Sequence, residues 1–350
     1  MIRLLPLLFL TTIGFAEEPY RIAFGSCAHQ EHPLPILNLV VEHKADVFVF
    51  LGDNLYGDTD DMSVLRSKYE RLTEKPSYRN LAANTRILAT WDDHDYGRND
   101  AGKEYAHKEA SKEIFLEFFG EPEDSSRRDH SGIYHAEYIE VAGKTVQILL
   151  LDNRTFRDPV LRADSDTQKN KDSRFFYRLD YQPHPQPGPT LLGAAQWKWL
   201  EGELRKSADV RIIASGSQFG IEYNGYEAWA NFPHEQQRMI DLIRETRAEG
   251  VIFLTGDVHY AEISRLEPEG GYPLYDLTAS GLSSTWKFAT PNANRIEGPI
   301  MDNHFGMLSL FLEASEPYLQ AEVWDIRNNQ RIEHTIPLSE LEFVDEEIDQ

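Results

Sequence analysis

Short, almost wholly apolar runs recur along the chain, and stretches with helical periodicity separate them. The run Val47–Leu51 contains no polar side chain, and Val251–Thr255 contains only one, at its end. Helical patterns over 193–207 and 233–249 each lead into a strand-like run. A strand that is buried on both faces has this composition, and strands that alternate with helices build a sheet with parallel neighbours. The chain is therefore predicted to adopt an α/β fold.

The other predicted elements keep this alternation over the first two thirds of the chain, and the last third is rich in strands. Further strands are predicted at 20–24, 86–91, 133–141, 144–151, 210–214, 261–266, 272–277, 307–314, 318–326 and 331–338, and further helices at 33–44, 62–74 and 103–119. Residues 155–190 break the pattern with five prolines and the aromatic cluster Phe175-Phe176-Tyr177. We interpret this segment either as a lid over a site or as a variable, solvated insertion.

The first sixteen residues have the composition of a signal peptide. Arg3 supplies the positive end, a run of apolar residues follows, and small residues precede a cleavage site after Ala16. No other segment has the roughly 20 apolar residues that a membrane-spanning helix needs. We therefore expect a secreted or periplasmic protein without a transmembrane anchor. Residues 17–340 are predicted to form one domain, and 341–350 an acidic tail.

The charge and the cysteine content limit the function classes. A formal net charge of −23 opposes binding to nucleic acids, because a nucleic-acid-binding face is basic. An anionic substrate remains compatible, since bound cations invert the local potential. We expect a small-molecule substrate and a monomer. Cys27 is the single cysteine, so its thiol is either buried and inert or a metal ligand.

Six predicted strands end in polar residues, several of which can bind metal ions. The segments are Gly25-Ser26-Cys27, Gly52-Asp53-Asn54-Leu55-Tyr56, Asp92-Asp93-His94-Asp95 with Asn99 after it, Asp152-Asn153-Arg154, Gly216-Ser217-Gln218 and Gly256-Asp257-Val258-His259. Each one alone is typical of a turn. In α/β proteins, however, sites form beyond the carboxyl ends of the strands. The six loops are therefore predicted to meet at one edge.

The spacing within these loops suits metal binding. Asp53 and Tyr56 lie three residues apart on one tight loop, so both can reach one ion. Asp257 and His259 lie two residues apart and would point the same way in an extended segment. The segment 92–95 contains three carboxylates, which repel one another unless cations neutralise them. A phenolate beside a thiolate favours Fe³⁺, whereas oxygen ligands suit Ca²⁺, Mg²⁺ or Mn²⁺ and imidazole suits Zn²⁺.

These residue types indicate hydrolysis of phosphate esters. Two ions that share a carboxylate, for which Asp53 is the natural choice, can hold a hydroxide that attacks phosphorus. His94 is predicted to donate a proton to the leaving oxygen. Arg154 is predicted to bind phosphate oxygens through its planar guanidinium. The alternative for Arg154 is an ion pair with Asp152 or Asp158.

Five of these stretches resemble the PhoD-like alkaline phosphatases, which belong to the calcineurin-like metallophosphoesterases. They are Phe24-Gly25-Ser26-Cys27, Gly52-Asp53-Asn54-Leu55-Tyr56, Trp91-Asp92-Asp93-His94-Asp95, Leu151-Asp152-Asn153-Arg154 and Thr255-Gly256-Asp257-Val258-His259. The resemblance runs from about residue 20 to 330, with the motifs in the family's order. It implies a four-layer αββα sandwich with two central mixed sheets, and phosphomonoesterase or phosphodiesterase activity. Fe³⁺ and Ca²⁺ are the expected ions, with Mn²⁺ and Zn²⁺ in other members.

The resemblance also implies a ferric site. Cys27, Asp53 and Tyr56 would bind the ferric ion. Asp257 or His259 would complete that site or its neighbour.

The resemblance implies a second site that shares Asp53. Asp93 and Asn99 would hold the second ion. Asp93 stands where many metallophosphoesterases carry Asn, Asp257 stands where they carry a first His, and Gln218 falls near another expected His. These exchanges favour Ca²⁺ at the second position. The expected substrate contacts are Arg154, Asn54 and Gln218. The stretch ahead of the first motif is too short for the N-terminal β-domain of longer members, so we expect an open site that accepts larger esters.

Two alternatives stay open. The first is a phosphodiesterase for larger esters such as phospholipid head groups, cyclic nucleotides or teichoic-type polymers. Aromatic residues at 223–232 and at Trp286-Lys287-Phe288 would then stack a base or a sugar. The second is a calcium-dependent binding module without turnover. Cys27 and His94 argue against that module, because a calcium cage needs only oxygen ligands.

Overall fold

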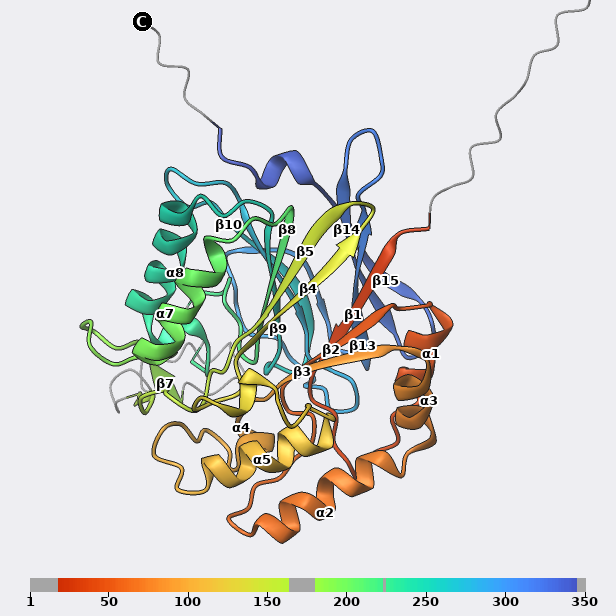
Figure 1. Cartoon of the computed structure of the whole chain (residues 1–350), viewed down its shortest axis with the longest axis vertical. Helices are drawn as coiled ribbons and strands as arrows, with labels where there is room; N and C mark the ends of the chain where they lie inside the picture. The colour runs from red at the N-terminus through yellow and green to blue at the C-terminus, as the bar shows by residue number, and fades with distance from the viewer. Residues whose placement is uncertain (1–17, 164–179, 223–224, 345–350) are drawn as a thin grey trace, which may run out of the picture.

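Two large mixed sheets form the centre of the protein (Figure 1). The computed structural model describes residues 18–163, 180–222 and 225–344. Sheet A has the spatial order β15 (Gln330–Pro337), β14 (Tyr318–Asp325), β13 (His304–Phe311), β1 (Tyr20–Gly25), β2 (Val47–Leu51) and β3 (Arg86–Thr90). Sheet B has the order β12 (Arg295–Ile300), β10 (Ala261–Leu266), β11 (Leu274–Ala279), β9 (Val251–Thr255), β8 (Val210–Ser215), β5 (Lys144–Leu150) and β4 (His135–Val141). Strands β1, β2 and β3 are parallel to one another, as are β5, β8, β9 and β11.

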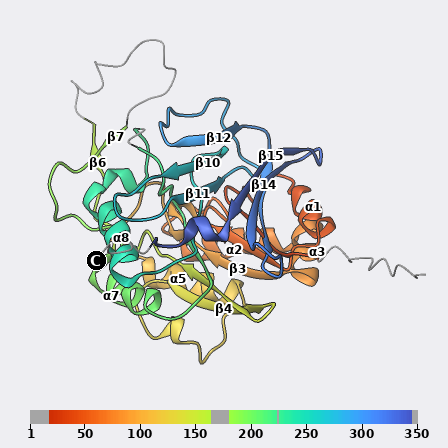
Figure 2. The same ribbon diagram turned by 90° about the horizontal axis from the view of Figure 1, so that it is seen from above.

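Helices cover the outer face of each sheet (Figures 1 and 2). Sheet A carries α1 (Ile36–Glu42), α2 (Met62–Thr73), α3 (Pro76–Asn84) and α5 (Lys108–Phe118), and sheet B carries α7 (Gly193–Leu204) and α8 (Pro233–Thr246). The short elements are α4 (Asp93–Tyr96), β6 (Leu161–Arg162), β7 (Tyr181–Gln182), η1 (Ser126–Arg128), η2 (Trp229–Asn231) and η3 (Leu338–Leu341). The predicted sandwich with two central mixed sheets is confirmed.

The position of strand β2 between two hydrophobic cores explains why its sequence is wholly apolar. Val47, Val49 and Leu51 pack into the core that lies between the sheets and extends under α7 and α8. Phe48 and Phe50 pack into the second core, under the helices of sheet A. Because alternate side chains of a strand point to opposite faces, a strand between two cores needs apolar residues throughout.

Three elements lacked a clear sequence signal. Strand β12 contains Gly298 and Pro299, which are unfavourable within strands, and it lies at the edge of sheet B, where proline is tolerated. Helix α3 begins with Pro76 at its first position and follows α2 closely. Helix α4 spans four residues. The helix predicted from residue 33 starts at Ile36, and the one predicted from residue 103 starts at Lys108.

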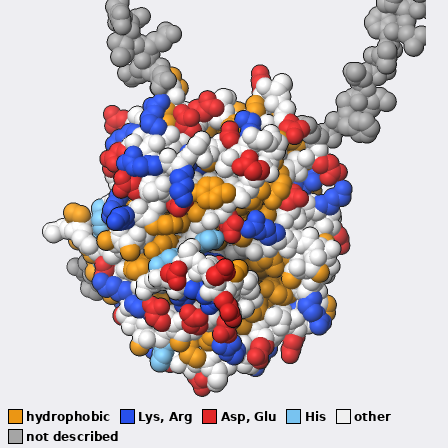
Figure 3. Space-filling model, viewed as in Figure 1, with side chains coloured by type: hydrophobic (Ala, Val, Ile, Leu, Met, Phe, Trp, Pro, Cys, Tyr) orange, Lys and Arg blue, Asp and Glu red, His pale blue; other side chains and the backbone are white. Residues whose placement is uncertain are grey.

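Some predictions lie outside the described residues. These include the signal peptide over 1–16, the cluster Phe175-Phe176-Tyr177, and most of the acidic tail. Within the described ranges, no helix has the length and apolar character that crossing a membrane requires. On the face in Figure 3, Lys and Arg side chains lie interspersed with Asp and Glu.

The buried His304 is expected to make stability depend on pH. Its side chain is 0% exposed, and its Nδ1–H donates to the Asp302 carbonyl at 2.8 Å. Burial lowers the pKa of His304 from 6.5 to about 4. The unfolded chain therefore binds a proton at a higher pH than the folded chain, and stability falls as pH drops from 6.5 towards 4. Protonation of His304 alone lowers the free energy of unfolding by about 3 kcal/mol between pH 6.5 and pH 4.

The test is urea unfolding of the wild type and of His304→Gln between pH 7.5 and 4.5, both with chelator present. The difference in unfolding free energy between the two proteins should shrink by about 3 kcal/mol as the pH falls. A difference that is constant with pH would mean that His304 does not titrate in this way.

Candidate metal centre

Loops from both sheets meet at one end of the sandwich. Cys27 follows β1, Asp53 follows β2 and Asp93 follows β3, all in sheet A. Arg154 follows β5 and His259 follows β9, in sheet B. The acidic, thiol and imidazole side chains form three groups, in each of which the possible ligand atoms lie within 4.8 Å of one another. Arg154 makes an ion pair with Asp93, a member of two of these groups.

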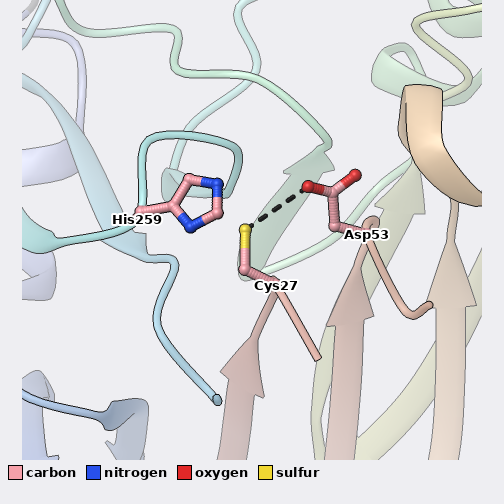
Figure 4. A group of neighbouring side chains, drawn as sticks. All are labelled: Cys27, Asp53 and His259. Carbon is pink, nitrogen blue, oxygen red and sulfur yellow. Dashed lines mark hydrogen bonds between the residues drawn. The ribbon is translucent and has the colours of Figure 1, made fainter. Parts of the chain in front are cut away.

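The first group consists of Cys27, Asp53 and His259, whose side chains point toward one another (Figure 4). The Cys27 Sγ atom lies 3.4 Å from Asp53 Oδ2 and 3.2 Å from the Ser280 hydroxyl. The His259 Nδ1 atom donates to the Ser284 carbonyl at 3.0 Å, which leaves Nε2 for the site. A carbonyl that accepts from the other ring nitrogen fixes the tautomer of metal-binding histidines in this way.

The second group consists of Asp53, Asp93 and His94. Asp53 belongs to both groups, so one carboxylate lies between two clusters of donors. The third group, Asp93, Asp100 and Glu227, shares Asp93 with the second. The three groups are thus linked in a row by two shared aspartates.

The backbone is left-handed at many of these residues. Six of the ten described non-glycine residues with positive φ belong to this region: Cys27, Asp53, Asp58, Asp100, Asp257 and His259. Such conformations are unfavourable for side chains other than Asn, Asp or Gly, and they concentrate at functional sites. Gly52 enables the close contact of two loops, since a Cβ there would lie 2.5 Å from the Asp92 backbone nitrogen. The strand ends are therefore shaped to bring these side chains together.

The predicted extended conformation of the loop after β9 is wrong. Asp257 and His259 have φ angles of 76° and 56°, so the segment turns at both residues. His259 reaches Cys27 and Asp53. Asp257 is not a member of the three groups. Its burial, and then the negative charges of Asp92 and Glu227, raise its pKa well above the usual value. His259 thus belongs to the first group, and Asp257 as a metal ligand stays a prediction.

Tyr56 lies at the centre of an aromatic cluster beside the first two groups. Its ring centroid lies 4.2 Å from that of His94 and 6.5 Å from that of His259. Its hydroxyl oxygen is buried and has no hydrogen-bond partner of normal geometry among the described residues. Burial, then the negative charges of Cys27 and Asp53, raise the pKa of Tyr56.

His94 is held from one side by Asp58. Its Nδ1 atom lies 2.8 and 2.9 Å from the two oxygens of the Asp58 carboxylate. Nδ1 therefore carries a proton, and Nε2 is left for the site. Burial opposes the charged imidazole, but Asp53 and Asp58 outweigh burial and raise the pKa of His94 to about 10. A protonated His94 at neutral and alkaline pH follows from this arrangement.

Arg154 has different ion-pair partners from those considered in the sequence. Its Nε and Nη2 atoms lie 2.6 Å from Asp92 Oδ1, and Nη1 donates to Glu227 at 2.7 Å. Asp152 only accepts from the Arg154 backbone nitrogen, and Asp158 pairs with Lys103. The guanidinium is 1% exposed and lies 3.8 Å from Asp93. Arg154 therefore faces the carboxylates of the centre, and its contact with phosphate stays a prediction.

Two predicted substrate contacts, Asn54 and Gln218, donate hydrogen bonds within the protein. The Asn54 amide donates to the Thr90 carbonyl at 2.8 Å and to Asp95 at 2.5 Å, and its side chain is fully buried. Gln218 is also fully buried, and its amide donates to Glu262 and Thr278 at 3.0 Å each. Asn54 Oδ1 and Gln218 Oε1 are buried and have no hydrogen-bond partner among the described residues, and the role of both residues in substrate binding stays a prediction.

The loop after β3 places its donors differently from the prediction. Asn99 has an exposed side chain, and its backbone nitrogen donates to Asp58 at 3.0 Å. The next residue, Asp100, joins the third group. Asn99 as a metal ligand stays a prediction.

Three residues of the region were not predicted: Asp58, Asp100 and Glu227. Asp58 and Asp100 follow predicted site residues within a few positions, so the acidic content of their loops was the available signal. Glu227 lies twelve residues after the end of β8 at Ser215 and has no local motif. Only the tertiary fold brings it to Arg154 and Asp93.

The charges of the centre fit metal cations. Burial is the first cause that raises the pKa of Asp92 to about 7, of Asp95 to about 8 and of Asp100 to about 6. Asp53 also has a pKa well above the usual range, because it is buried beside Cys27. Asp93 is the exception. Burial raises its pKa, but the positive charges of Arg154 and His94 outweigh burial and lower the pKa to about 2. Clustered carboxylates of this kind are stabilised by cations.

Three buried side-chain oxygens without hydrogen-bond partners also fit a centre that binds metal cations. Asp53 Oδ1, Tyr56 Oη and Asp92 Oδ2 are buried and lack hydrogen-bond partners in the described structure. Each buried polar atom without a partner needs an explanation, and for atoms that lie together in a donor cluster the binding of an ion is one. The donor set of thiol, phenol, imidazole and carboxylate therefore fits metal ions.

Comparison with known proteins agrees with this geometry. A family described as "PhoD-like phosphatase" matches residues 22–305. Alkaline phosphatase D of Bacillus subtilis (strain 168) is 25% identical to the chain, and the match covers 70% of this chain and 46% of that protein. The chain thus spans about half the length of this curated relative.

Solved structures share the fold. A structure of PhoD has a TM-score of 0.66 at 18% identity and covers 95% of this chain and 72% of its own. A dimetal phosphatase from Danio rerio has a TM-score of 0.54 at 12% identity and covers 92% of this chain and all of its own. At these identities the likeness concerns the fold.

Proposed function

Because the chain belongs to the PhoD-like phosphatase family, we propose that it hydrolyses phosphate esters with the help of bound metal ions. The observation that carries this proposal is the shared carboxylate of Asp53. It lies between the donor group of Cys27 and His259 and the donor group of Asp93 and His94. Such a pair of adjoining sites supports chemistry that needs two ions.

The proposed ligands follow the three groups. Cys27, Asp53, Tyr56 and His259 would hold one ion, for which the thiolate and phenolate favour Fe³⁺. Asp53 and Asp93 would hold the second, for which oxygen donors favour Ca²⁺, with Mn²⁺, Zn²⁺ or Mg²⁺ as alternatives. When bound, such ions neutralise phosphate charge and lower the pKa of water.

The side chains of the protein would then perform defined tasks. The protonated imidazole of His94, oriented by Asp58, donates a proton to the leaving oxygen. Arg154 keeps Asp92 and Glu227 paired, and its charge lowers the pKa of Asp93, so that Asp93 stays ionised as a ligand. Asp95 accepts one hydrogen bond from the Asp53 backbone nitrogen and one from the Asn54 backbone nitrogen, and so fixes the shared ligand in place.

The direct test is turnover of p-nitrophenyl phosphate and bis-p-nitrophenyl phosphate at pH 8 to 9. We expect release of p-nitrophenolate that a chelator abolishes and that metal salts restore. The ratio of the two rates ranks monoester against diester. Turnover that survives complete removal of metal would contradict the proposal.

The environment of the enzyme is part of the proposal. The signal-peptide pattern of residues 1–16 supports export to the periplasm or the medium. The interspersed surface charges and the net charge of −23 support a small-molecule ester as substrate and a protein that does not bind nucleic acid. A binding module without turnover is the second candidate, and the same assay separates it from an enzyme.

A further inference from the structure

Aromatic side chains form a stacked row that begins at His259. The ring of Trp286 lies 5.1 Å from the His259 imidazole at an interplanar angle of 17°. Phe288 lies 5.1 Å beyond Trp286 at 13°, and Tyr226 contacts Trp286 at 4.9 Å. We call Tyr226, Trp286 and Phe288 the aromatic patch. Trp286 and Phe288 are near-parallel, Tyr226 is tilted against Trp286 by 46°, and the patch adjoins a residue of the candidate metal centre.

The patch is not used to pack the core. The three side chains are partly exposed, and in the part of the chain that the structure describes they belong to none of the hydrophobic clusters. Contiguous apolar surface outside the core marks binding sites, and aromatic side chains are enriched in such sites. The exposed part of these rings is therefore a surface that a planar ligand can cover.

The patch is fixed to the candidate metal centre on two sides. The Ser283 backbone nitrogen donates to the Cys27 carbonyl at 3.1 Å, and the Trp286 backbone nitrogen donates to the His259 carbonyl at 3.1 Å. On the other side, Tyr226 directly precedes Glu227, a member of the third carboxylate group. The rings are thus held in position before a substrate arrives, which reduces the entropy lost on binding.

We propose that the aromatic patch binds an aromatic ring on the ester group that stays on phosphorus. The enzyme would then select phosphodiesters with an aryl or nucleoside substituent. The patch starts at His259, whereas His94, which would protonate the leaving oxygen, is held by Asp58 in another loop. A monoester has no second organic group to reach the patch. This inference rests on the proposed hydrolysis of phosphate esters.

The test uses two diesters with the same leaving group, p-nitrophenyl phenyl phosphate and p-nitrophenyl ethyl phosphate. In both, water adds its oxygen to phosphorus, the bond from phosphorus to the p-nitrophenyl oxygen breaks, and p-nitrophenolate leaves while the proton of water passes to buffer. The measured quantity is the phenyl-to-ethyl ratio of kcat/KM. The ratio is taken within one protein sample, so it does not depend on the fraction of active enzyme.

Trp286→Leu keeps an apolar side chain but removes the flat ring, and the ratio should fall about tenfold relative to wild type. Tyr318→Leu is the matched control. It removes one ring from the stacked pair Phe311–Tyr318, whose centroids lie 4.5 Å apart at 10°. That pair lies beside the start of β1, far from the strand ends that form the site. Tyr318→Leu should keep the wild-type ratio.

The outcomes separate two failures. An unchanged ratio in Trp286→Leu, or an equal fall in Tyr318→Leu, overturns the role of the aromatic patch while hydrolysis itself stands. If the metal-loaded wild type hydrolyses p-nitrophenyl phosphate but neither diester, this inference alone is overturned. If it releases p-nitrophenolate from none of the three esters, the proposed function is overturned, and this inference with it.

Discussion

Asp53→Asn is expected to reduce hydrolysis of p-nitrophenyl phosphate on the order of 10³-fold, because several kcal/mol of transition-state stabilisation depend on paired ions. Asp53 is the carboxylate common to the first two donor groups, and an amide cannot bridge two cations. Asparagine also tolerates the φ angle of 49° at this position, so the backbone should be preserved. The measurement is kcat/KM together with metal content.

Thermal unfolding distinguishes a metal ligand from a residue that only supports the fold. A ligand that binds only the folded state stabilises it, so metal should raise the Tm of wild type. Burial beside Cys27 raises the pKa of Asp53, and a group with a raised folded pKa loses stability as pH rises. In chelator at pH 8, Asp53→Asn should therefore be at least as stable as wild type, but metal should no longer raise its Tm.

The matched control for Asp53 is Asp60→Ala. Asp60 is an exposed carboxylate on the same loop and pairs with Arg98. It should keep both the activity and the rise in Tm with metal. If Asp53→Asn retained full activity, or if both variants lost it equally, the bridging role would be wrong.

His94→Gln is expected to slow esters with poor leaving groups by about 10²- to 10⁴-fold, the usual contribution of a general acid. Esters with good leaving groups need little protonation, so their rates should fall much less. The measurement is the dependence of kcat/KM on the pKa of the leaving alcohol. The slope should become steeper in the variant.

Asp58→Asn supplies the companion variant, because Asp58 orients His94 through Nδ1 without belonging to any of the donor groups among the described residues. Asp58→Asn should also make kcat/KM depend more steeply on the pKa of the leaving alcohol, but by a smaller amount than His94→Gln. An equal loss for good and poor leaving groups in His94→Gln would remove the acid role and leave His94 as a metal ligand or a structural residue.

Much of the fold could be predicted because the buried strands have a strong apolar pattern in the sequence. Strands that lie between two cores, such as β2 and β9, are wholly buried and therefore nearly wholly apolar. Strand β12 and helix α4 gave no such pattern, since one is an edge strand with Gly298 and Pro299 and the other has four residues. Tertiary contacts, rather than local propensity, stabilise these elements.

The site could be predicted as far as single loops allowed. Cys27, Asp53, Asp93 and His94 follow strand ends, and the structure brings them together with His259. What single loops could not show is which way each side chain points. Gln218 also follows a strand, yet it turns into sheet B toward Thr278.

The partners of Arg154 required the tertiary fold. Its carboxylate partners come from the loop after β3 and from the segment that precedes η2, both far away in the sequence. Sequence proximity suggested Asp152 and Asp158 instead. An ion pair between distant segments leaves no local signature, so only the packing of the two sheets shows it.

The most direct test of a two-ion centre is the metal content of the purified protein, measured by elemental analysis before and after chelation, with p-nitrophenyl phosphate turnover measured on the same samples. We expect at least two ions per chain, and a parallel loss of ions and turnover on chelation. Calcium alone without turnover, or full turnover with no bound metal, would contradict this expectation.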